Sequence, residues 1–159
     1  NAQFRLNGYK QALAASGLPI KAELIKSGDY KVDGGYSATK ALLGEKREFT
    51  ALFASNDLMA FGAYKAAKES GLRLPEQLSI VGFDSIEMPG VIEPKITSME
   101  IPAYKMAVQA TNMLLDLIDG VAPKESKVYY RLKLVEKGST APEPSLLTLR
   151  GKEVPQQRN

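Results

Sequence analysis

The sequence predicts an α/β fold in which a mostly parallel sheet is flanked by helices. Stretches with helical spacing alternate with short apolar runs, and glycines mark many of the boundaries between them. Alternating helices and buried strands are typical of parallel sheets whose faces are covered by helices. The 159 residues suit one domain with a sizeable core, and 44% apolar and 25% charged residues are ordinary for a globular protein.

The first half of the chain alternates between predicted helices and strands. Each predicted helix is followed by a glycine, which is the common residue just after a helix C-terminus. The predicted strands are short apolar runs. The expected elements are helices at 4–16, 29–43 and 57–70 and strands at 20–25 and 50–54, the latter a buried strand.

The second half continues the alternation after a proline-containing connection at 72–77. The apolar run at 78–83 predicts another buried strand, and two prolines and a glycine predict a loop at 85–94. Pro102 suits the first turn of a helix that runs to Asp119 and carries one apolar stripe. Alternating apolar residues at 127–136 predict a last strand with one apolar face.

Polar residues directly follow two of the predicted strands. Asn56 and Asp57 come just after the strand at 50–54, and Asp84 comes after the strand at 78–83. In open parallel sheets, ligands bind outside the carboxyl ends of the strands, and these ends share one edge. We therefore expect Asn56 and Asp84 to emerge at the same edge of the sheet.

Two interpretations of these polar residues remain open. An amide and a carboxylate together suit a neutral ligand rich in hydroxyls, such as a sugar, because they offer both donors and acceptors. Ser, Asn and Asp are also the preferred residues at helix N-termini. Both interpretations hold if the two residues have different roles. We therefore expect Asp57 to lie in the first turn of the helix and Asn56 to face the cleft.

Several function classes are excluded or unsupported by composition. Cysteine and histidine are absent, which excludes disulfides, thiol catalysis, Ser-His-Asp triads and zinc sites with Cys or His ligands. The formal net charge is +3, and the basic residues are scattered, which favours a solvated surface over a nucleic-acid patch. No apolar run reaches the ~18 residues of a membrane-spanning helix.

The enzyme motifs in the chain are weak. Ser37-Ala38-Thr39-Lys40 matches the S-x-x-K signature of penicillin-recognising serine enzymes, but the S-D-N and K-T-G motifs are missing. Neither a P-loop nor a G-x-G-x-x-G motif is present. Nothing in the sequence brings Asp29, Asp33 and Glu87 together as a hydrolytic carboxylate pair. We expect no enzyme activity and no cofactor or metal.

Two sequence blocks are specific to a known family. Residues 53–62 read FASNDLMAFG, and residues 71–84 read GLRLPEQLSIVGFD. These blocks resemble the lactose-repressor (LacI/GalR) family of transcription regulators. Shorter matches are RLNGY at 5–9, PKITS at 94–98 and LVEKGST at 134–140. The resemblance covers about residues 3–142, and the two longer blocks are specific at their mutual spacing.

The resemblance implies an effector-binding domain with the type I periplasmic-binding-protein fold, in which the ligand lies between two lobes. Arg5, Asn56 and Asp84 match the polar residues that contact the effector in this family. Tyr30 falls where the family often has an aromatic residue that packs on the ligand. The family's dimer face implies four contact residues here, which are Phe61, Tyr64, Met88 and Val91.

The resemblance also implies that this chain is part of a larger arrangement. It assigns 3–100 to a C-terminal lobe, 101–126 to a crossover that normally belongs to the other lobe, and 127–136 to a return strand, with 143–159 as a tail. The DNA-reading headpiece and most of the other lobe are missing. We therefore expect the stripe of the crossover helix to lack its cover and to favour dimerisation or exchange. The stripe includes Met106, Met113, Leu114 and Leu117.

The expected function is sensing of a small sugar-like effector in a homodimeric, cytoplasmic bacterial regulator. Operator DNA would be bound only through the missing headpiece. A periplasmic sugar-binding protein of a transporter is the alternative, because it shares the fold. Ile101 stands where several family members have a polar ligand residue, which suggests a different effector.

Overall fold

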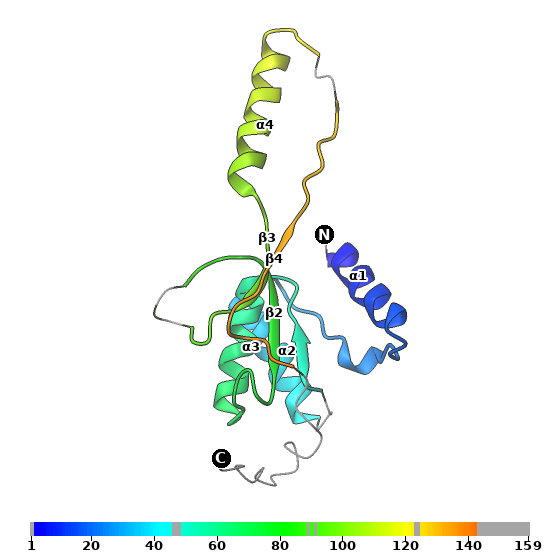
Figure 1. The fold of residues 1–159 in the computed structure, drawn as a ribbon, viewed down its shortest axis with the longest axis vertical. Coiled ribbons are helices and arrows are strands. Elements are labelled where there is room, and N and C mark those ends of the chain that lie inside the picture. The colour runs from blue at the N-terminus through cyan, green and yellow to red at the C-terminus, as the bar shows by residue number, and fades with distance from the viewer. Residues whose placement is uncertain (1, 46–48, 89, 91, 123–124, 143–159) are drawn as a thin grey trace, which may run out of the picture.

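Figure 1 shows the computed structural model of the chain, with some helices beside a small sheet and others that project away from it. The structure describes residues 2–45, 49–88, 90, 92–122 and 125–142. Within these ranges the sheet has the order β1-β2-β3-β4. The strands are β1 (Ala51–Phe53), β2 (Ser79–Asp84), β3 (Thr97–Glu100) and β4 (Lys133–Val135). The predicted α/β fold with a mostly parallel sheet is confirmed.

The strand register brings two predicted polar positions to one edge. β1 runs parallel to β2, with Phe53 opposite Val81, and β2 runs parallel to β3, while β4 pairs with β3 in the antiparallel sense. The carboxyl ends of β1 and β2 therefore face the same way. Asn56 follows β1 after two residues, and Asp84 ends β2, so both lie at the edge where the sequence predicted them.

Helix α3 (Asp57–Glu69) packs against the sheet, and α2 (Val32–Gly44) packs against α3. Two glycines allow the helices to approach closely. A Cβ atom on Gly35 would collide with the main chain of Met59, and one on Gly62 would collide with the carbonyl oxygen of Val32. These clashes explain why glycine stands at both positions.

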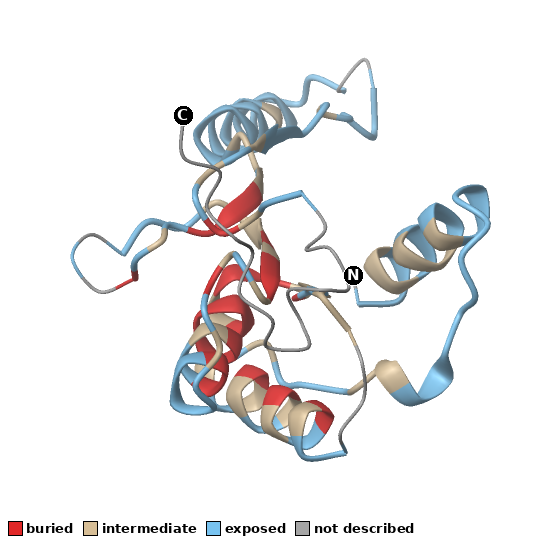
Figure 2. Ribbon diagram, turned by 60° about the horizontal axis from the view of Figure 1, so that its bottom comes forward, coloured by how far each residue is buried: buried red, intermediate tan, exposed pale blue. Residues whose placement is uncertain are grey.

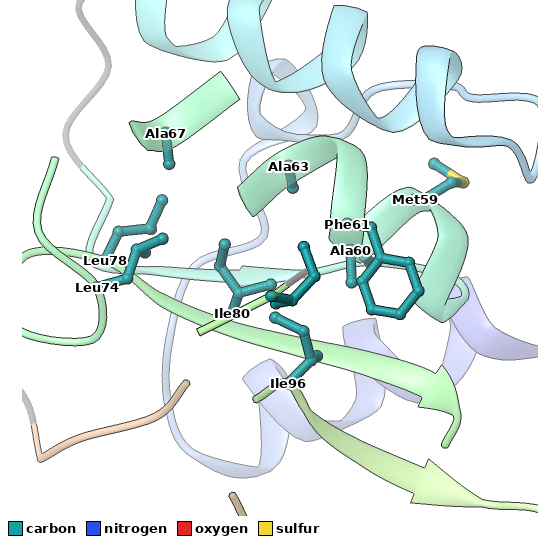
Figure 3. Close-up of a cluster of buried hydrophobic side chains, with 11 residues drawn as sticks. Met59, Ala60, Phe61, Ala63, Ala67, Leu74, Leu78, Ile80 and Ile96 are labelled. Carbon is teal, nitrogen blue, oxygen red and sulfur yellow. The ribbon is translucent and has the colours of Figure 1, made fainter. Parts of the chain in front are cut away.

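The core lies between α3 and the central strands. Figure 3 shows Ala60, Ala63, Ile80 and Ile96 in this layer, where the small alanines bring the helix near the strands. Figure 2 shows the same distribution over the whole chain, with buried residues gathered on α3 and the sheet. This packed layer supports the edge that carries Asn56 and Asp84.

Helix α4 (Ala103–Ile118) projects away from this body and is followed by a long return segment (Figure 1). None of its residues is buried. Leu114 and Leu117 of the predicted stripe are 57% and 56% exposed, respectively. The stripe therefore lacks a cover within the described chain, as the sequence led us to expect.

Helix α1 (Ala2–Ala15) also has no buried residue. The ring of Tyr9, which belongs to α1, stacks on the ring of Phe53 at the edge of the sheet, with 6.5 Å between the ring centroids. The other link of α1 to the body is Arg5, at the carboxyl edge of the sheet. The helix is therefore held on the body mainly by side chains at one edge.

The prediction of a strand at 20–25 is wrong. The chain forms a 3-10 turn, η1 (Ala22–Leu24), and Ile25 is extended but belongs to no strand. Extended backbone becomes a strand only when another strand pairs with it. The described residues supply no such neighbour, although the local residue types suit a strand.

The observed sheet differs from the prediction in three smaller ways. The run at 50–54 predicted a buried strand, but β1 is an edge strand in which Ala51 and Phe53 are exposed. The return strand predicted at 127–136 pairs only over β4, because β3 is itself only four residues long. β3 was not predicted, since its sequence mixes polar and apolar residues without clear alternation.

Candidate functional site

Four predicted ligand-binding residues come together at the carboxyl edge of the sheet from separate parts of the chain. Arg5 comes from α1, Tyr30 precedes α2, Asn56 precedes α3 and Asp84 ends β2. Nη2 of Arg5 lies 3.5 Å from Oδ1 of Asp84, and its guanidinium carbon lies 5.9 Å from the ring centroid of Tyr30. Nδ2 of Asn56 donates to the carbonyl oxygen of Tyr30 at 3.0 Å. We call these four residues the edge site.

Arg5 is the residue that joins the parts of the edge site. Its guanidinium lies over the ring of Phe83, 3.8 Å from the ring centroid, and it donates to the carbonyl oxygen of Ser55. A guanidinium has five N–H donors, so the contacts to Ser55 and Asp84 leave donors for a ligand. Sequence reasoning missed Phe83, although its position beside Asp84 in β2 was a usable signal.

The helix-capping interpretation of Asn56 is confirmed. Its side-chain oxygen accepts a hydrogen bond from the backbone N–H of Met59 at 3.0 Å, so Asn56 caps α3. Because its amide nitrogen also holds the carbonyl of Tyr30, Asn56 fixes the position of that residue. The amide therefore builds the wall of the edge site as well as capping the helix.

Asp57 lies in the first turn of α3, as expected, while its carboxylate accepts hydrogen bonds from other elements. One carboxylate oxygen accepts from the hydroxyl of Ser98 at 2.7 Å, and the other accepts from the backbone N–H of Ile86 at 2.6 Å. Gly82 leaves the space that this carboxylate fills, since a Cβ atom there would collide with it. Asp57 thus ties α3 to β3 and to the loop after β2.

Burial raises the pKa of both carboxyl groups above the ordinary value of 3.8. At Asp84 the guanidinium of Arg5 lowers the pKa and so opposes the burial effect. At Asp57 the hydrogen bonds from Ser98 and Ile86 oppose it. A desolvated carboxylate forms stronger hydrogen bonds with a ligand than a hydrated one does, which suits Asp84 for binding.

Backbone strain gathers at the same place. Tyr30, Asp84 and Ser85 have positive φ angles of 63°, 105° and 57°. Residues other than glycine adopt such angles rarely, and strained backbone concentrates at binding and catalytic sites. The strain at Tyr30 and Asp84 therefore supports a functional role for the edge site.

The four predicted dimer residues have unequal exposure. Phe61 is only 5% exposed because it packs in the core, so it offers little surface to a partner. Tyr64 is half-buried and donates its hydroxyl to the carbonyl of Glu93. Met88 is 39% exposed, and Val91 lies outside the described residues.

The described ranges contain no group of three or more acidic residues placed to hold a metal ion. No helix among them is both long and apolar enough to cross a membrane.

The chain is similar to known bacterial regulators. The model of the family described as periplasmic binding protein-like domain matches residues 1–140. The HTH-type transcriptional regulator MalR of Clostridium butyricum is 40% identical over 138 residues, which are 86% of this chain and 40% of MalR.

Two solved structures extend this comparison. A sugar-binding transcriptional regulator of the LacI family from Escherichia coli, in complex with phosphate, is 37% identical with a TM-score of 0.77, covering 87% of this chain and 50% of that chain. A dimeric Lac repressor is 30% identical with a TM-score of 0.78, again covering 87% and 50%. This chain thus spans 40% of the length of the curated relative and half of these two structures.

Proposed function

Since the chain belongs to the periplasmic binding protein-like domain family, as a region related to the effector-binding domains of LacI-family regulators, we propose that it senses the effector of a bacterial transcription regulator. The effector is a small sugar or sugar derivative. Operator DNA is bound by a headpiece that these residues do not contain. The regulator acts in the cytoplasm.

The convergence of Arg5, Tyr30, Asn56 and Asp84 is the observation that carries this proposal. A sugar hydroxyl can accept from the guanidinium of Arg5 and donate to the carboxylate of Asp84, while the rings of Tyr30 and Phe83 offer apolar faces. A hydrogen bond to a charged group contributes roughly 1.5–3 kcal/mol net, so two or three of them with an aromatic contact give about micromolar affinity.

The geometry also supports a way to transmit the binding event. Arg5 connects α1 to the end of β2, and Asn56 connects α3 to the backbone of Tyr30. A ligand that competes for these groups changes how α1 and the segment before α2 are held on the body. Such a differential interaction between two arrangements is what an allosteric effector requires.

The relatives favour this function over the alternative. The matched proteins are transcription regulators rather than transport proteins or enzymes. A periplasmic sugar-binding protein would share the fold and the polar edge. The similarity to MalR over 86% of the chain therefore argues for the regulator.

We propose that the regulator is a homodimer. The exposed stripe of α4 supports this, because an apolar stripe of that extent favours association. Tyr64 and Met88 provide further surface near the loop after β2, and the dimeric Lac repressor has a similar fold.

A thermal-shift screen of sugars and sugar derivatives tests the proposed function. A cognate ligand should raise the melting temperature of the wild type, and Asp84→Ala should abolish the rise. Asp33→Ala, which removes an exposed carboxylate on α2, is the matched control and should keep the response. If Asp84→Ala responds like the wild type, the edge site does not bind the effector.

A further inference from the structure

Asp57 follows Asn56 of the edge site in the sequence but turns its carboxylate into the protein. Asp57 is 1% exposed, and no other charged residue of the described chain is buried as deeply. Removing a charge from water is costly unless hydrogen bonds compensate for the lost hydration. The groups that bind this carboxylate therefore indicate what it does.

The carboxylate of Asp57 and the hydroxyl of Ser98 together bind the backbone that follows Asp84. The hydroxyl of Ser98 donates to one carboxylate oxygen and accepts from the N–H of Ser85 at 3.1 Å. The other carboxylate oxygen accepts from the N–H of Ile86 at 2.6 Å. Both backbone N–H groups directly after Asp84 are thus bound by Asp57 and Ser98, which we call the acceptor pair.

The backbone that the acceptor pair binds is strained. Asp84 and Ser85 have φ angles of 105° and 57°, which residues other than glycine adopt rarely. Such angles persist only where the surrounding structure holds them. A rotation of either φ toward an ordinary negative value would turn the N–H groups of Ser85 and Ile86 away from their acceptors. The acceptor pair therefore opposes relaxation of this segment.

The other strained residue of the edge site is held in a similar way. Tyr30 has a φ of 63°, and its carbonyl oxygen accepts from the side-chain amide of Asn56 at 3.0 Å. In the described part of the chain, positive φ at residues other than glycine occurs only at Tyr30, Asp84 and Ser85. The adjacent residues Asn56 and Asp57, at the start of α3, thus hold both strained segments of the edge site.

The donors around Asp57 require a carboxylate at this position. The N–H of Ser85 can only donate, so it uses the oxygen of Ser98, and the hydroxyl hydrogen of Ser98 goes to Asp57. The N–H of Ile86 can also only donate. Both oxygens of Asp57 therefore accept. An asparagine would present an NH₂ group in place of one oxygen, so one of the two donors would lose its acceptor.

We propose that Asp57 and Ser98 are positioning residues, which hold residues 84–86 so that the carboxylate of Asp84 lies beside Arg5 for effector binding. The inference rests on the proposed function and extends it to two residues that act through Asp84. Oδ1 of Asp84 lies 3.5 Å from Nη2 of Arg5. If residues 84–86 relax, the carboxylate moves relative to the guanidinium, and a ligand hydroxyl meets a different arrangement of the two groups.

The conformation of residues 84–86 can be tested without an effector. Positive φ brings the amide proton of a residue close to its own Hα, which gives a strong nuclear Overhauser effect (NOE) between the two protons. Asp84 and Ser85 should show these strong NOEs in the wild type. The NOEs should weaken in Ser98→Ala and in Asp57→Asn, which keeps the shape of the side chain. NOEs that stay strong in both variants would overturn the proposal.

Ser139→Ala is the matched control for Ser98→Ala. Ser139 is 1% exposed and Ser98 is 0% exposed, and each hydroxyl accepts from one backbone N–H and donates to one oxygen. The partners of Ser139 are Thr97 and Ile80, which lie outside the edge site. Both alanine variants should lose stability, but only Ser98→Ala should alter the NOEs. Equal weakening in Ser139→Ala would contradict a specific role of the acceptor pair.

Effector affinity measures the consequence for binding. The probe is the sugar that gives the largest rise in melting temperature with the wild type, and calorimetric titration is carried out where every variant is folded. Ser98→Ala and Asp57→Asn should each weaken binding at least about tenfold, the effect of losing one hydrogen bond to a charged group. Ser139→Ala should bind like the wild type. Ser98→Thr, which restores a hydroxyl, should recover most of the affinity.

The two readouts distinguish a failure of the positioning role from a failure of the proposed function. Wild-type affinity in both Ser98→Ala and Asp57→Asn would contradict the positioning role even though a sugar binds. A wild type that binds no sugar would instead overturn the proposed function, while the NOEs still decide whether the acceptor pair holds residues 84–86.

Discussion

Helices α3 and α4 differ sharply in what covers them, although both carry apolar residues at helical spacing. Helix α3 buries eight residues between α2 and the sheet, whereas α4 buries none. The apolar stripe of α4 is as clear in the sequence as that of α3. The difference shows that an apolar stripe predicts a helix with a face to bury, while the partner that covers the face is set by tertiary structure.

The largest expected effect is a loss of stability that occurs when a core residue of the body is truncated but not when a residue of α4 is. Ile80 is fully buried in the core, so Ile80→Ala should lower the free energy of unfolding by about 2–5 kcal/mol. Leu117→Ala on exposed α4 should change it by less than about 0.5 kcal/mol in dilute solution. Denaturant unfolding at low protein concentration measures both. Similar losses would mean that α4 is covered in the isolated chain.

The next effect concerns Asp57, whose carboxylate links α3 to the sheet. Asp57→Ala leaves the hydroxyl of Ser98 and the N–H of Ile86 without their acceptor. Ser98 is fully buried whereas Ile86 is partly exposed, and one buried unpaired group costs about 1–3 kcal/mol, so a loss of that size is expected. Asp116→Ala on α4 is the matched control and should be nearly neutral. A neutral result for Asp57→Ala would show that the two hydrogen bonds do not stabilise the fold.

The association of α4 gives a smaller effect. If the stripe forms a dimer contact, Leu114→Asp/Leu117→Asp should weaken dimerisation at least about tenfold, or ~1.4 kcal/mol, because charges would be buried in an apolar contact. The unfolding of the body should not change. Sedimentation across a concentration series checks both expectations. A wild type that stays monomeric at all concentrations would refute this interpretation of the stripe.

The smallest effect is a pH dependence at Asp84. Because burial raises the pKa of its carboxyl above 3.8 in the folded chain, the folded state binds more protons than the unfolded state between that value and the raised one. The contribution of Asp84 to stability is therefore fully present below pH 3.8 and is lost as pH rises through the raised pKa. Asp84→Asn should remove this loss and flatten that part of the stability curve.

Unfolding of the wild type and Asp84→Asn across this pH range measures the effect. The reverse slope, with Asp84 stabilising the fold as pH rises, would mean that the ion pair with Arg5 outweighs burial. The charge of Asp84 also helps to raise the pKa of Asp57, so Asp84→Asn lessens that rise, and Asp57 adds to the difference between the two proteins with the same sign.

Two of the four residues of the edge site, Asn56 and Asp84, were predictable from local patterns. The two apolar runs fixed where β1 and β2 end, so Asn56 and Asp84 could be placed at one edge. Arg5 and Tyr30 came from the family resemblance alone, since nothing in their own sequence neighbourhoods places them beside Asp84.

The failures occurred where long-range contacts decide the structure. β3 carries Thr97 and Ser98, which read as polar loop residues, yet both are buried. The hydroxyl of Ser139 accepts from the backbone N–H of Thr97, and the carboxylate of Asp57 accepts from the hydroxyl of Ser98. The stretch at 20–25 has strand-like residues but no described partner. The division of roles between Asn56 and Asp57 depended on Ser98 and Gly82, both distant in sequence.

Chemical-shift mapping of a bound effector tests the central claim most directly. A sugar that raises the melting temperature is titrated into the ¹⁵N-labelled chain. The largest shifts should occur at Arg5, Tyr30, Asn56 and Asp84 and their sequence neighbours, while residues of α4 change little. Saturable shifts that centre on another surface and leave these four residues unchanged would contradict the claim that the edge site is the effector site.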